Sequence, residues 1–540
     1  MICTAANSLW LAGCLFEAAR YRRALRQVRV EQERLLLDLI RANASTQFGR
    51  EHGFSSIRSV RDYQHAVPPR SFDEYGIYVD RAASGSHQVL TREPIRLFEP
   101  TSGSAAATKL IPYTTGLQRQ FQRAIQTWIA DLYLHRPDLM RGQAYWSVSP
   151  AAVTPHHTAS GIPIGFEDDS EYVGGWQKRL VQATMAAPAT LRRLTDIDAF
   201  QYATVLALVR SESLRIISVW NPTFLMVLLD RLPAYGDALL HDLELTMGNR
   251  RRADVLRAAL RARTGAERHA ILWPKLGLIS CWADANAAAA ADALRRQFRH
   301  AEVQPKGLIA TEGFVSLPMI GLEGSLLAVR SHFFEFAEIG RVDRAPSLAH
   351  ELERGRFYEV LLSTAGGLYR YRLRDVIEVL GHVHECPVMR FVGRDGYVSD
   401  WFGEKLNEAH VGRVLAEALE RAGVKASFAM LACDSTLPAY VLYIDPADAA
   451  VTDESLEVIT QRVDAMLRQN FHYDHARRHG QLAGVRVFRA RGAGATYLAT
   501  RVRAGQRAGD VKPLALDRGN GWSERFEGLL VPQRDERIHA

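Results

Sequence analysis

Small hydroxyl residues surround a glycine at Thr101-Ser102-Gly103-Ser104, and a lysine follows at Lys109. Backbone N–H groups and side-chain hydroxyls in such a loop can converge on an anion, and the lysine adds a point charge. Phosphate is the natural ligand of this arrangement. The loop lacks the Gly-Lys-Ser/Thr ending of a Walker P-loop, and a Ser-Gly-Ser turn taken alone is also compatible with an ordinary surface loop.

A second candidate site lies in the segment from Gly307 to Gly313, which we interpret as an apolar strand that ends in Thr311 and Glu312. Carboxylates placed beside phosphate oxygens are a common way for proteins to hold Mg²⁺. The alternative is a strand-end glutamate that faces water.

Aromatic and basic residues alternate before an acidic residue in a third segment. Strand periodicity predicts Tyr369 and Tyr371 on one face and Arg370 and Arg372 on the other. Asp375, at the end of the strand, could accept hydrogen bonds from both hydroxyls of a ribose, as acidic residues do in dinucleotide folds. The alternative is a half-buried edge strand with a solvated basic face.

Two further segments lie toward the C-terminus. Arg394-Asp395 leads through a polar stretch to Glu404-Lys405. A few residues between two rigid bodies can absorb a rotation, so we expect a hinge there. Lys512-Pro513 would carry no information if it stood alone.

The elements that must position these residues are predicted to be α/β. Short branched apolar runs alternate with helical patterns between residues 90 and 395, after a helical lead-in segment over residues 1–90. The pattern then restarts as a smaller α+β unit with its own core. We place the boundary near Asp395, which gives domains 1–395 and 396–540. Three elements are expected in the second domain: a helix over 408–422, a strand over 439–444 and a helix over 453–470.

Composition indicates a soluble globular protein, because 47% of the 540 residues are hydrophobic and 24% are charged. The net charge of +7 is spread over solvated helix faces; its densest cluster, Arg20–Arg29, is predicted on one amphipathic helix, with a nucleic-acid-binding arm as the minor reading. Five dispersed cysteines suggest neither disulfides nor a zinc site and favour the cytoplasm. We find no signal-peptide pattern and no run near the roughly 20 apolar residues that span a bilayer, and so expect no membrane partner. We expect no nucleic-acid partner, because the arginines are dispersed beside acidic residues. The sequence does not determine the oligomeric state, for which we expect a monomer.

In this order, the segments resemble the auxin-responsive-promoter (Gretchen Hagen type) family of acyl acid amido synthetases, as a bacterial-type member. That family is a branch of the adenylate-forming superfamily of acyl-CoA synthetases and luciferase. The resemblance covers almost the whole chain. It matches the hydroxyl loop with Lys109, Ala310-Thr311-Glu312, the segment from Tyr369 to Val376, the hinge region and Lys512-Pro513.

The resemblance implies a large N-terminal adenylate-forming domain with mixed central sheets and helices, and a smaller mobile α+β C-terminal domain. It also implies roles for individual residues. Ser102, Gly103 and Ser104 would hold phosphates, and Glu312 would hold Mg²⁺. Asp375 would bind the ribose, Arg394 would bind the nucleotide near the hinge, and Ala310 and Thr311 would belong to the ATP site. Lys109 and Lys512 would stabilise the adenylate as it forms.

The implied reaction uses ATP and Mg²⁺ to join a carboxylic acid to AMP, and then transfers the acyl group to an amino acid or another amine. Rotation about Asp395 would replace Lys512 with the loop that carries Glu404 and Lys405. An acyl-CoA ligase is the nearest alternative, and a binding protein without chemistry is the alternative from another class.

The acyl pocket is the least determined part of the site. Phe121, Phe224 and Trp282 are candidates for its walls, although helix spacing also makes Phe121 an ordinary core residue. The sequence departs from the family at Ala105-Ala106-Ala107, which offers fewer hydroxyl donors than many members. Arg374 also replaces the usual glycine before Asp375, and Leu308 replaces a tyrosine of plant members.

Overall fold

The computed structural model describes residues 2–100, 109–146, 156–165, 175–188, 190–191, 194, 196–339, 341, 344–394, 398–399, 404, 406–434, 438–478, 481–504, 506 and 511–532. The chain forms two compact units, each described by itself below. Unit 1 holds Met1–Trp220, Leu228–Trp282 and Arg295–Phe391, and unit 2 holds Asn221–Val227, Ala283–Leu294 and Val392–Ala540. The assignment of two short upstream segments to unit 2 was not expected. The predicted boundary at Asp395 lies outside the described residues and stays a prediction.

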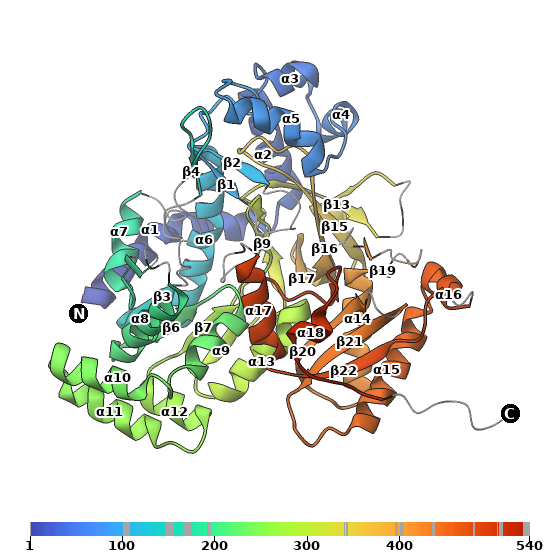
Figure 1. Cartoon of the computed structure of the whole chain (residues 1–540). Coiled ribbons are helices and arrows are strands. Elements are labelled where there is room, and N and C mark those ends of the chain that lie inside the picture. The colour runs from blue at the N-terminus through green and yellow to red at the C-terminus, as the bar shows by residue number, and fades with distance from the viewer. Residues whose placement is uncertain are drawn as a thin grey trace. The chain divides into compact units, whose positions relative to one another are not determined.

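Helices open unit 1 (Figure 1). They are α1 (Ile2–Ala24), α2 (Val28–Ala42), α3 (Gln47–Glu51), α4 (Val60–Ala66) and α5 (Phe72–Ala83). The single amphipathic helix predicted across Arg20–Arg29 is wrong, because the chain turns between α1 and α2. The residues that join the two helices follow the last turn of α1, which already carries Arg22 and Arg23.

These helices are part of the unit 1 core rather than a lead-in segment. The Tyr21 hydroxyl donates to the carbonyl of Leu327 at 2.7 Å, and the Gln32 amide donates to the carbonyl of Val329 at 2.7 Å. Contacts between residues some 300 positions apart cannot be read from local sequence.

Helix α1 also bears on the expectation of no membrane partner. In the part of the chain that the structure describes, it is the one helix that is long and apolar enough to cross a membrane by length and composition. Packed core helices and signal sequences pass the same test. Trp10, Cys14 and Tyr21 on its inner face belong to the main core.

A small sheet precedes the long helix α6 (Thr115–His135). Its strands lie in the order β2-β1-β5-β4, and their bounds are β1 (Leu97–Pro100), β2 (Leu110–Tyr113), β4 (His156–His157) and β5 (Pro163–Ile164). Thr114 caps α6 by accepting a hydrogen bond from the Leu117 N–H at 3.1 Å. The predicted phosphate loop joins β1 to β2, so Lys109 stands directly before a strand that leads into a capped helix.

A parallel sheet follows, with strand order β3-β6-β7-β8. Parallel neighbours need crossover connections, and helices supply them here. The strands are β3 (Gln143–Trp146), β6 (Leu214–Ser218), β7 (Leu278–Cys281) and β8 (Glu302–Pro305); the helices are α7 (Gly175–Thr184), α8 (Ile197–Arg210), α9 (Pro222–Asp230), α10 (Gly236–His241), α11 (Arg250–Leu260), α12 (Gly265–Leu272) and α13 (Ala288–Gln297). The predicted α/β alternation is confirmed.

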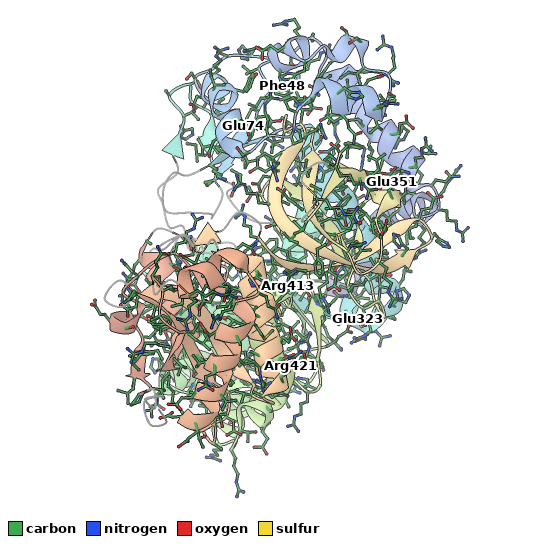
Figure 2. The ribbon with its side chains drawn as sticks, turned by 90° about the vertical axis from the view of Figure 1, so that its right-hand side faces the viewer. Phe48, Glu74, Glu323, Glu351, Arg413 and Arg421 are labelled. Carbon is green, nitrogen blue, oxygen red and sulfur yellow. The ribbon has the colours of Figure 1, made fainter. Side chains whose placement is uncertain are left out.

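A hairpin and a seven-stranded sheet complete unit 1. The hairpin is β9 (Ile309–Ala310) with β10 (Gly313–Phe314), and the sheet order is β11-β12-β17-β16-β15-β13-β14. Its strands are β11 (Ser316–Pro318), β12 (Ser325–Leu327), β13 (Phe333–Glu338), β14 (Ser347–Leu348), β15 (Phe357–Ser363), β16 (Tyr371–Val383) and β17 (Cys386–Arg394). Phe48, labelled in Figure 2, stacks on Tyr369 with ring centroids 4.9 Å apart, so the N-terminal helices pack where β16 begins.

Unit 2 is built on a five-stranded sheet of order β23-β20-β21-β22-β24. Residues of β20 (Ala426–Asp434) alternate between two cores, with Leu431 and Cys433 in one and Met430 and Ala432 in the other. The remaining elements are β18 (Val398–Ser399), β19 (Leu406–Asn407), α14 (Glu408–Arg421), β21 (Ala439–Pro446), α15 (Asp453–Leu467), α16 (Phe471–Arg478), β22 (Arg486–Arg491), α17 (Ala493–Arg503), β23 (Leu516–Asp517), α18 (Trp522–Arg525) and β24 (Glu527–Leu530). Figure 2 shows Arg413 and Arg421 on α14. The predicted α+β character is confirmed.

Candidate active site

Glu312 lies in a tight turn rather than at the end of a long strand. The register pairs Ala310 with Gly313, so Thr311 and Glu312 are the two residues of the β9–β10 turn. The predicted strand that runs into these two residues is therefore only the short β9. Glu312 is nevertheless buried, at 5% exposure, which excludes the water-facing alternative.

Tyr371 joins the second predicted ATP segment to the third. Its hydroxyl donates a 2.9 Å hydrogen bond to Oε1 of Glu312. Tyr371 is the first residue of β16 and Glu312 is in the β9–β10 turn, so the contact fixes two segments that lie 59 residues apart. No hydrogen bond to Oε2 of Glu312 and no ion pair of this carboxylate is found among the described residues.

His332 holds the Glu312 hairpin against α6. Its Nε2 accepts from the Phe314 N–H at 3.0 Å, and its Nδ1 lies 3.0 Å from Oε1 of Gln120. Accepting at Nε2 requires a neutral ring with its proton on Nδ1. Burial lowers the pKa of His332 to about 3, and the nearby Arg123 charge acts in the same direction. The same Gln120 oxygen accepts from the Ala365 N–H at 2.9 Å, which ties α6 to the β15–β16 turn.

Gly313 makes the approach of His332 possible. A Cβ at this position would lie 3.1 Å from Nε2 of His332, closer than nearly all Cβ contacts. The glycine that follows Glu312 is therefore a requirement of this hydrogen bond.

Asp375 lies in a bulge of β16. Glu359 pairs with Val376 and Leu361 pairs with Arg372, so three residues of β16, including Asp375, lie opposite one residue of β15. Arg374 within the bulge has φ of 63°, a left-handed conformation that suits glycine. This is where the sequence departs from the family's glycine. Asp375 is buried at 4% exposure.

The strand alternation predicted for Arg370 is wrong, and the alternative of a solvated basic face is excluded for this residue because its side chain is buried. It precedes β16 with φ of 51°, and its Nε donates to Oε2 of Glu335 at 2.9 Å. Its NH1 group donates to the carbonyls of Gln64 and Val67 at 2.9 and 2.7 Å. Arg372 is exposed and pairs with Glu359.

Other predicted residues of unit 1 fall into three groups. Lys109 is half-buried, with its Nζ 5.5 Å from the ring centroid of Phe72. Ser102, Gly103 and Ser104 lie outside the described residues. Phe121 is a core residue whose ring lies 6.1 Å from that of Phe314, whereas Trp282 packs against Trp220 at 5.9 Å.

In unit 2, Glu408 organises the predicted hinge. Its Oε2 accepts from the Arg394 N–H at 2.9 Å, and its Oε1 accepts from the Ala515 N–H at 3.2 Å. A single buried carboxylate therefore links the end of β17 to the segment just after Lys512. The sequence contained this glutamate but gave no sign of its partners.

Lys512 is half-buried, and neighbouring contacts fix its backbone. The Tyr497 hydroxyl donates to the Lys512 carbonyl at 3.4 Å, and the Asn221 amide donates to the carbonyl of Val511. Phe224 lies in the same upstream segment as Asn221 and is buried. Phe224 belongs to unit 2, whereas Phe121 and Trp282 belong to unit 1, and the acyl pocket predicted from these three residues stays a prediction.

Glu404 is fully buried in unit 2 and accepts a hydrogen bond from the Tyr440 hydroxyl. Burial and the Glu404 charge raise the pKa of Tyr440. Asp395 and Lys405, the other predicted residues of the second half-reaction, lie outside the described residues.

A polar cluster at the carboxyl edge of the parallel sheet was missed by the sequence analysis. Nζ of Lys306 donates to Oγ of Ser218 at 2.6 Å and lies 5.0 Å from the Trp220 ring. Ser280 and Gln304 stand in register beside Ser218, and each has a buried polar atom without a hydrogen-bond partner in the described structure. Ligands of open α/β sheets bind at this edge. The signal available in sequence was that Ser218 and Ser280 each follow an apolar strand run.

Comparison with known proteins defines the class. The model of the GH3 family N-terminal domain matches residues 18–303, and that of the GH3 family central domain matches residues 325–394. The chain is similar in structure to a solved acyl acid amido synthetase, AtGH3.15 in complex with 2,4-DB, with a TM-score of 0.83 over 97% of this chain and 98% of that one at 18% identity. The chain therefore has the fold of that synthetase.

The protein belongs to the GH3 family, since the N-terminal match alone spans more than half of the chain. It is 26% identical over 466 residues to a putative indole-3-acetic acid-amido synthetase GH3.10 of Oryza sativa subsp. japonica, covering 84% of this chain and 90% of the relative. It is 24% identical over 463 residues to the indole-3-acetic acid-amido synthetase GH3.8 of Oryza sativa subsp. indica, covering 76% and 74%. The predicted family, fold class and ligase class are confirmed.

Proposed function

We propose that this protein uses ATP and Mg²⁺ to convert a carboxylic acid into an acyl-adenylate and then transfers the acyl group to the amino group of an amino acid. The observation that carries the proposal is the hydrogen bond from Tyr371 to Glu312. It brings the predicted metal-binding carboxylate to the strand that also carries Asp375, the predicted ribose ligand.

Glu312 fits a magnesium ligand. A buried carboxylate without an ion pair is costly unless hydrogen bonds or a metal stabilise it. Among the described residues Glu312 has a hydrogen bond at Oε1 only, so Oε2 can coordinate a cation. The same residues contain no cluster of three or more metal-ligating side chains, which suits Mg²⁺, because this ion keeps waters and phosphate oxygens as ligands. Bound Mg²⁺ would neutralise phosphate charge.

The residues of the chain have distinct tasks in the first half-reaction. Attack of the acid's carboxylate on the α-phosphate brings two anions together, and pyrophosphate leaves. Lys109 and Lys512 would supply positive charge as the phosphate oxygens gain negative charge. Asp375 would orient the ribose, and His332 would hold the Glu312 hairpin in place through Phe314.

Transfer is the second half-reaction. The amino group of the acceptor attacks the acyl carbon, the C–O bond to AMP breaks, and AMP leaves while the nitrogen loses a proton. We propose that rotation of unit 2 brings the Glu404-Lys405 loop into the site for this step. The acid we propose is an indole or aryl carboxylic acid, because relatives are named for indole-3-acetic acid and for 4-substituted benzoates.

The first experiment is ATP–pyrophosphate exchange with aryl, indole and fatty acids as a panel. We expect exchange that depends on both the acid and Mg²⁺. Glu312→Ala should reduce it by roughly 10²- to 10³-fold, as expected for loss of one electrostatic partner. Glu323→Ala, at an exposed glutamate labelled in Figure 2, is the matched control and should retain full exchange. Exchange unchanged by Glu312→Ala would remove this residue from the metal site.

The second experiment identifies the acceptor. Reaction mixtures that contain ATP, the best acid of the panel, amino acids and CoA together are analysed by mass spectrometry. An acyl amide as the main product supports the proposal. Acyl-CoA as the main product would overturn the amide step and leave an acyl-CoA ligase.

A further inference from the structure

The outer face of helix α1 carries no charge over five turns. Its buried face contacts α6 and α7, and the residues that face outward are apolar, small or uncharged. Ile2, Leu9 and Phe16 on this face are 74%, 58% and 71% exposed. Exposed apolar residues scattered singly are normal, but a continuous stripe on one helix calls for a partner. The other outward residues of the stripe are Thr4, Ala5, Ser8, Ala12, Gly13, Leu15 and Ala19.

Exposed arginines follow immediately. Arg20, Arg22 and Arg23 lie in the last turns of α1, and Arg26 and Arg29 lie just beyond it. The Arg20 guanidinium lies 5.5 Å from the Phe16 ring, so the basic cluster adjoins the apolar stripe directly. This is the densest basic cluster of the sequence, and the proposed ligase chemistry does not use it.

We propose that the outer face of α1 docks on an anionic lipid surface, with the apolar stripe in the interface and the arginines on the headgroup phosphates. A helix with an apolar face and a basic flank lies in the plane of such a surface. Basic residues near the surface bind anionic lipids through the surface potential. The absence of an uninterrupted apolar run, on which we based the expectation of no membrane partner, does not bear on a helix that lies in the interface.

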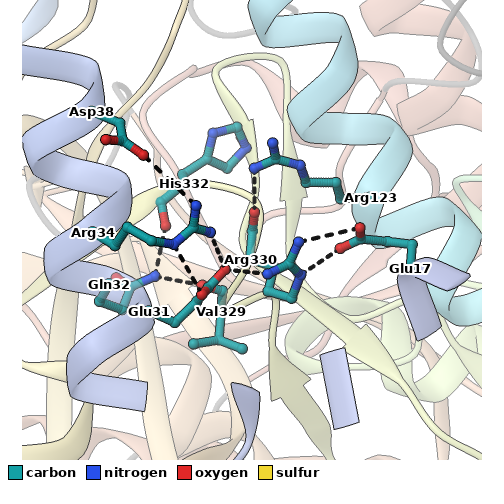
Figure 3. A network of polar contacts seen from close by, with 9 residues as sticks. All are labelled: Glu17, Glu31, Gln32, Arg34, Asp38, Arg123, Val329, Arg330 and His332. Atoms are coloured by element: carbon teal, nitrogen blue, oxygen red, sulfur yellow. Dashed lines mark hydrogen bonds and ion pairs between the residues drawn. The ribbon is translucent and has the colours of Figure 1, made fainter. Parts of the chain in front are cut away.

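The inner face of α1 rules against a spanning helix. Glu17 is buried and its Oε1 accepts from Nε of Arg330 at 2.6 Å, inside the network shown in Figure 3. Tyr21 donates to Leu327, and the Asn7 amide donates to the Met140 carbonyl at 3.0 Å. Withdrawing α1 into a bilayer would break these contacts and leave the buried Arg330 without one of its two carboxylate partners. The helix therefore meets the surface while it stays packed on unit 1.

The test is flotation of the full-length protein with vesicles of phosphatidylcholine alone or of phosphatidylcholine with phosphatidylglycerol. We expect binding to the anionic vesicles, weak binding to the neutral ones, and release at high salt because the arginine contribution is screened. Binding that resists both high salt and alkaline extraction would indicate a spanning helix and overturn the proposal. No binding to anionic vesicles would overturn it as well.

Two matched pairs of variants locate the surface. Leu9→Ser with Phe16→Ser should weaken vesicle binding by about tenfold or more, since two apolar side chains leave the interface. Leu245→Ser with Leu529→Ser, at positions 74% and 76% exposed elsewhere, should have no effect. If the two double variants bind anionic vesicles equally well, the apolar stripe of α1 is excluded as the docking surface.

The arginines are tested against a control variant that has the same net charge. Substitution of Arg20, Arg22, Arg23 and Arg26 by Gln should weaken binding to anionic vesicles by about fivefold for each arginine that reaches the surface. The same change at the exposed Arg250, Arg251, Arg261 and Arg263 removes equal charge and should leave binding intact. Loss of binding in both sets would indicate attraction by net charge alone and overturn the docking face.

Two controls separate the remaining outcomes. Pyrophosphate exchange should be unchanged in all these variants, because none touches the proposed site, so lost exchange would indicate misfolding. Sedimentation of the wild type without lipid should show no α1-dependent dimer. A dimer that Leu9→Ser with Phe16→Ser dissociates would make a second copy the partner of this face instead of a membrane.

Discussion

Glu312 in unit 1 and Glu404 in unit 2 are both buried glutamates that accept a hydrogen bond from a tyrosine hydroxyl. Their surroundings differ. Glu312 is in a two-residue turn held by His332 through Phe314, whereas Glu404 lies in a core beside Cys433, whose thiol pKa is raised to about 12 by burial and then by the Glu404 charge. We assign Glu312 to the adenylation half-reaction and Glu404 to the transfer half-reaction as predictions.

The difference indicates which carboxylate is ready for a ligand. Among the described residues, Glu312 has only the Tyr371 bond, and the turn that carries it presents its Oε2 without a protein partner. Glu404 is fully buried at 0% exposure, so its use in transfer requires its surroundings to open. We infer that Glu312, the carboxylate proposed for adenylation, is preformed for a ligand and that Glu404, the carboxylate proposed for transfer, is not.

Among the variants that test this comparison, Lys512→Ala is expected to have the largest effect on activity. If unit 2 contributes only a cation to adenylation, the variant should lose adenylate formation by roughly 10²- to 10³-fold. Supplied with chemically made acyl-adenylate, it should still form amide at a near wild-type rate. The two half-reactions are measured separately, by pyrophosphate exchange and by amide release.

Equal loss of both half-reactions would give Lys512 a structural role or contradict the rotation. A solvent-facing lysine before Pro513 predicts no change in either assay. Asn221→Ala removes the hydrogen bond to the Val511 carbonyl but keeps Lys512, so we expect it to slow adenylate formation less than Lys512→Ala does.

Tyr371→Phe and Tyr440→Phe remove the same hydroxyl from the two glutamates. Loss of a hydrogen bond to a buried carboxylate costs about 1–3 kcal/mol. At Tyr371 we expect the cost in catalysis, as roughly tenfold slower exchange and a higher Mg²⁺ requirement. At Tyr440 we expect it in the free energy of unfolding, measured by urea titration, with exchange nearly unchanged. Matching effects in the two variants would remove the distinction between the carboxylates.

His332→Gln tests the support of the Glu312 hairpin through pH. The folded-state pKa of about 3 lies below the unfolded value of about 6.5, so the unfolded chain binds the proton first and stability is lost as pH falls from about 6.5 toward 3. At pH 5 the cost is about 2 kcal/mol. The variant should lose this slope in denaturant titrations made at several pH values.

His269→Gln is the matched control, because burial lowers the pKa of His269 to about 4 at a place away from the hairpin. Both variants should flatten the pH dependence of stability. Only His332→Gln should also slow pyrophosphate exchange. If both variants slow exchange, His332 has no specific role in positioning the Glu312 hairpin.

Local patterns predicted the elements better than their contacts. The helix expected over 408–422 is α14, the strand over 439–444 lies within β21, and the helix over 453–470 is α15 with an earlier end. Period and capping residues carry such information within one segment. Thr311 and Glu312, expected at the end of a strand, form the two-residue turn of a hairpin. Nothing in the sequence marked this turn, because neither of its two residues is glycine or asparagine.

Long-range partners could not be predicted at all. Arg330 pairs with Glu17 across 313 positions, and Tyr371 reaches Glu312 only because β16 passes the hairpin. Alternation placed Arg370 on one strand face with Arg372, but Arg370 has a left-handed backbone and precedes the strand. The order of motifs indicated the family, whereas the Lys306 cluster depends on strand register, which a sequence does not show.

Arg374→Gly gives the smallest expected effect and tests β16, the strand that carries both Tyr371, the partner of Glu312, and Asp375. Arg374 has φ of 63° in the bulge that carries Asp375, a conformation that costs a non-glycine residue about 1 kcal/mol. Glycine, the residue usual in the family, would remove that strain while the gain in unfolded-chain entropy opposes it. We therefore expect the free energy of unfolding to change by less than about 1 kcal/mol, and the concentration of ATP for half-maximal exchange to stay within about twofold if the bulge is set by the sheet register. A large rise in that concentration would show instead that the Arg374 side chain itself contacts the nucleotide. Arg374→Ala separates the two readings, since it removes the side chain and keeps the backbone strain: only a contact role predicts that alanine and glycine weaken ATP use equally.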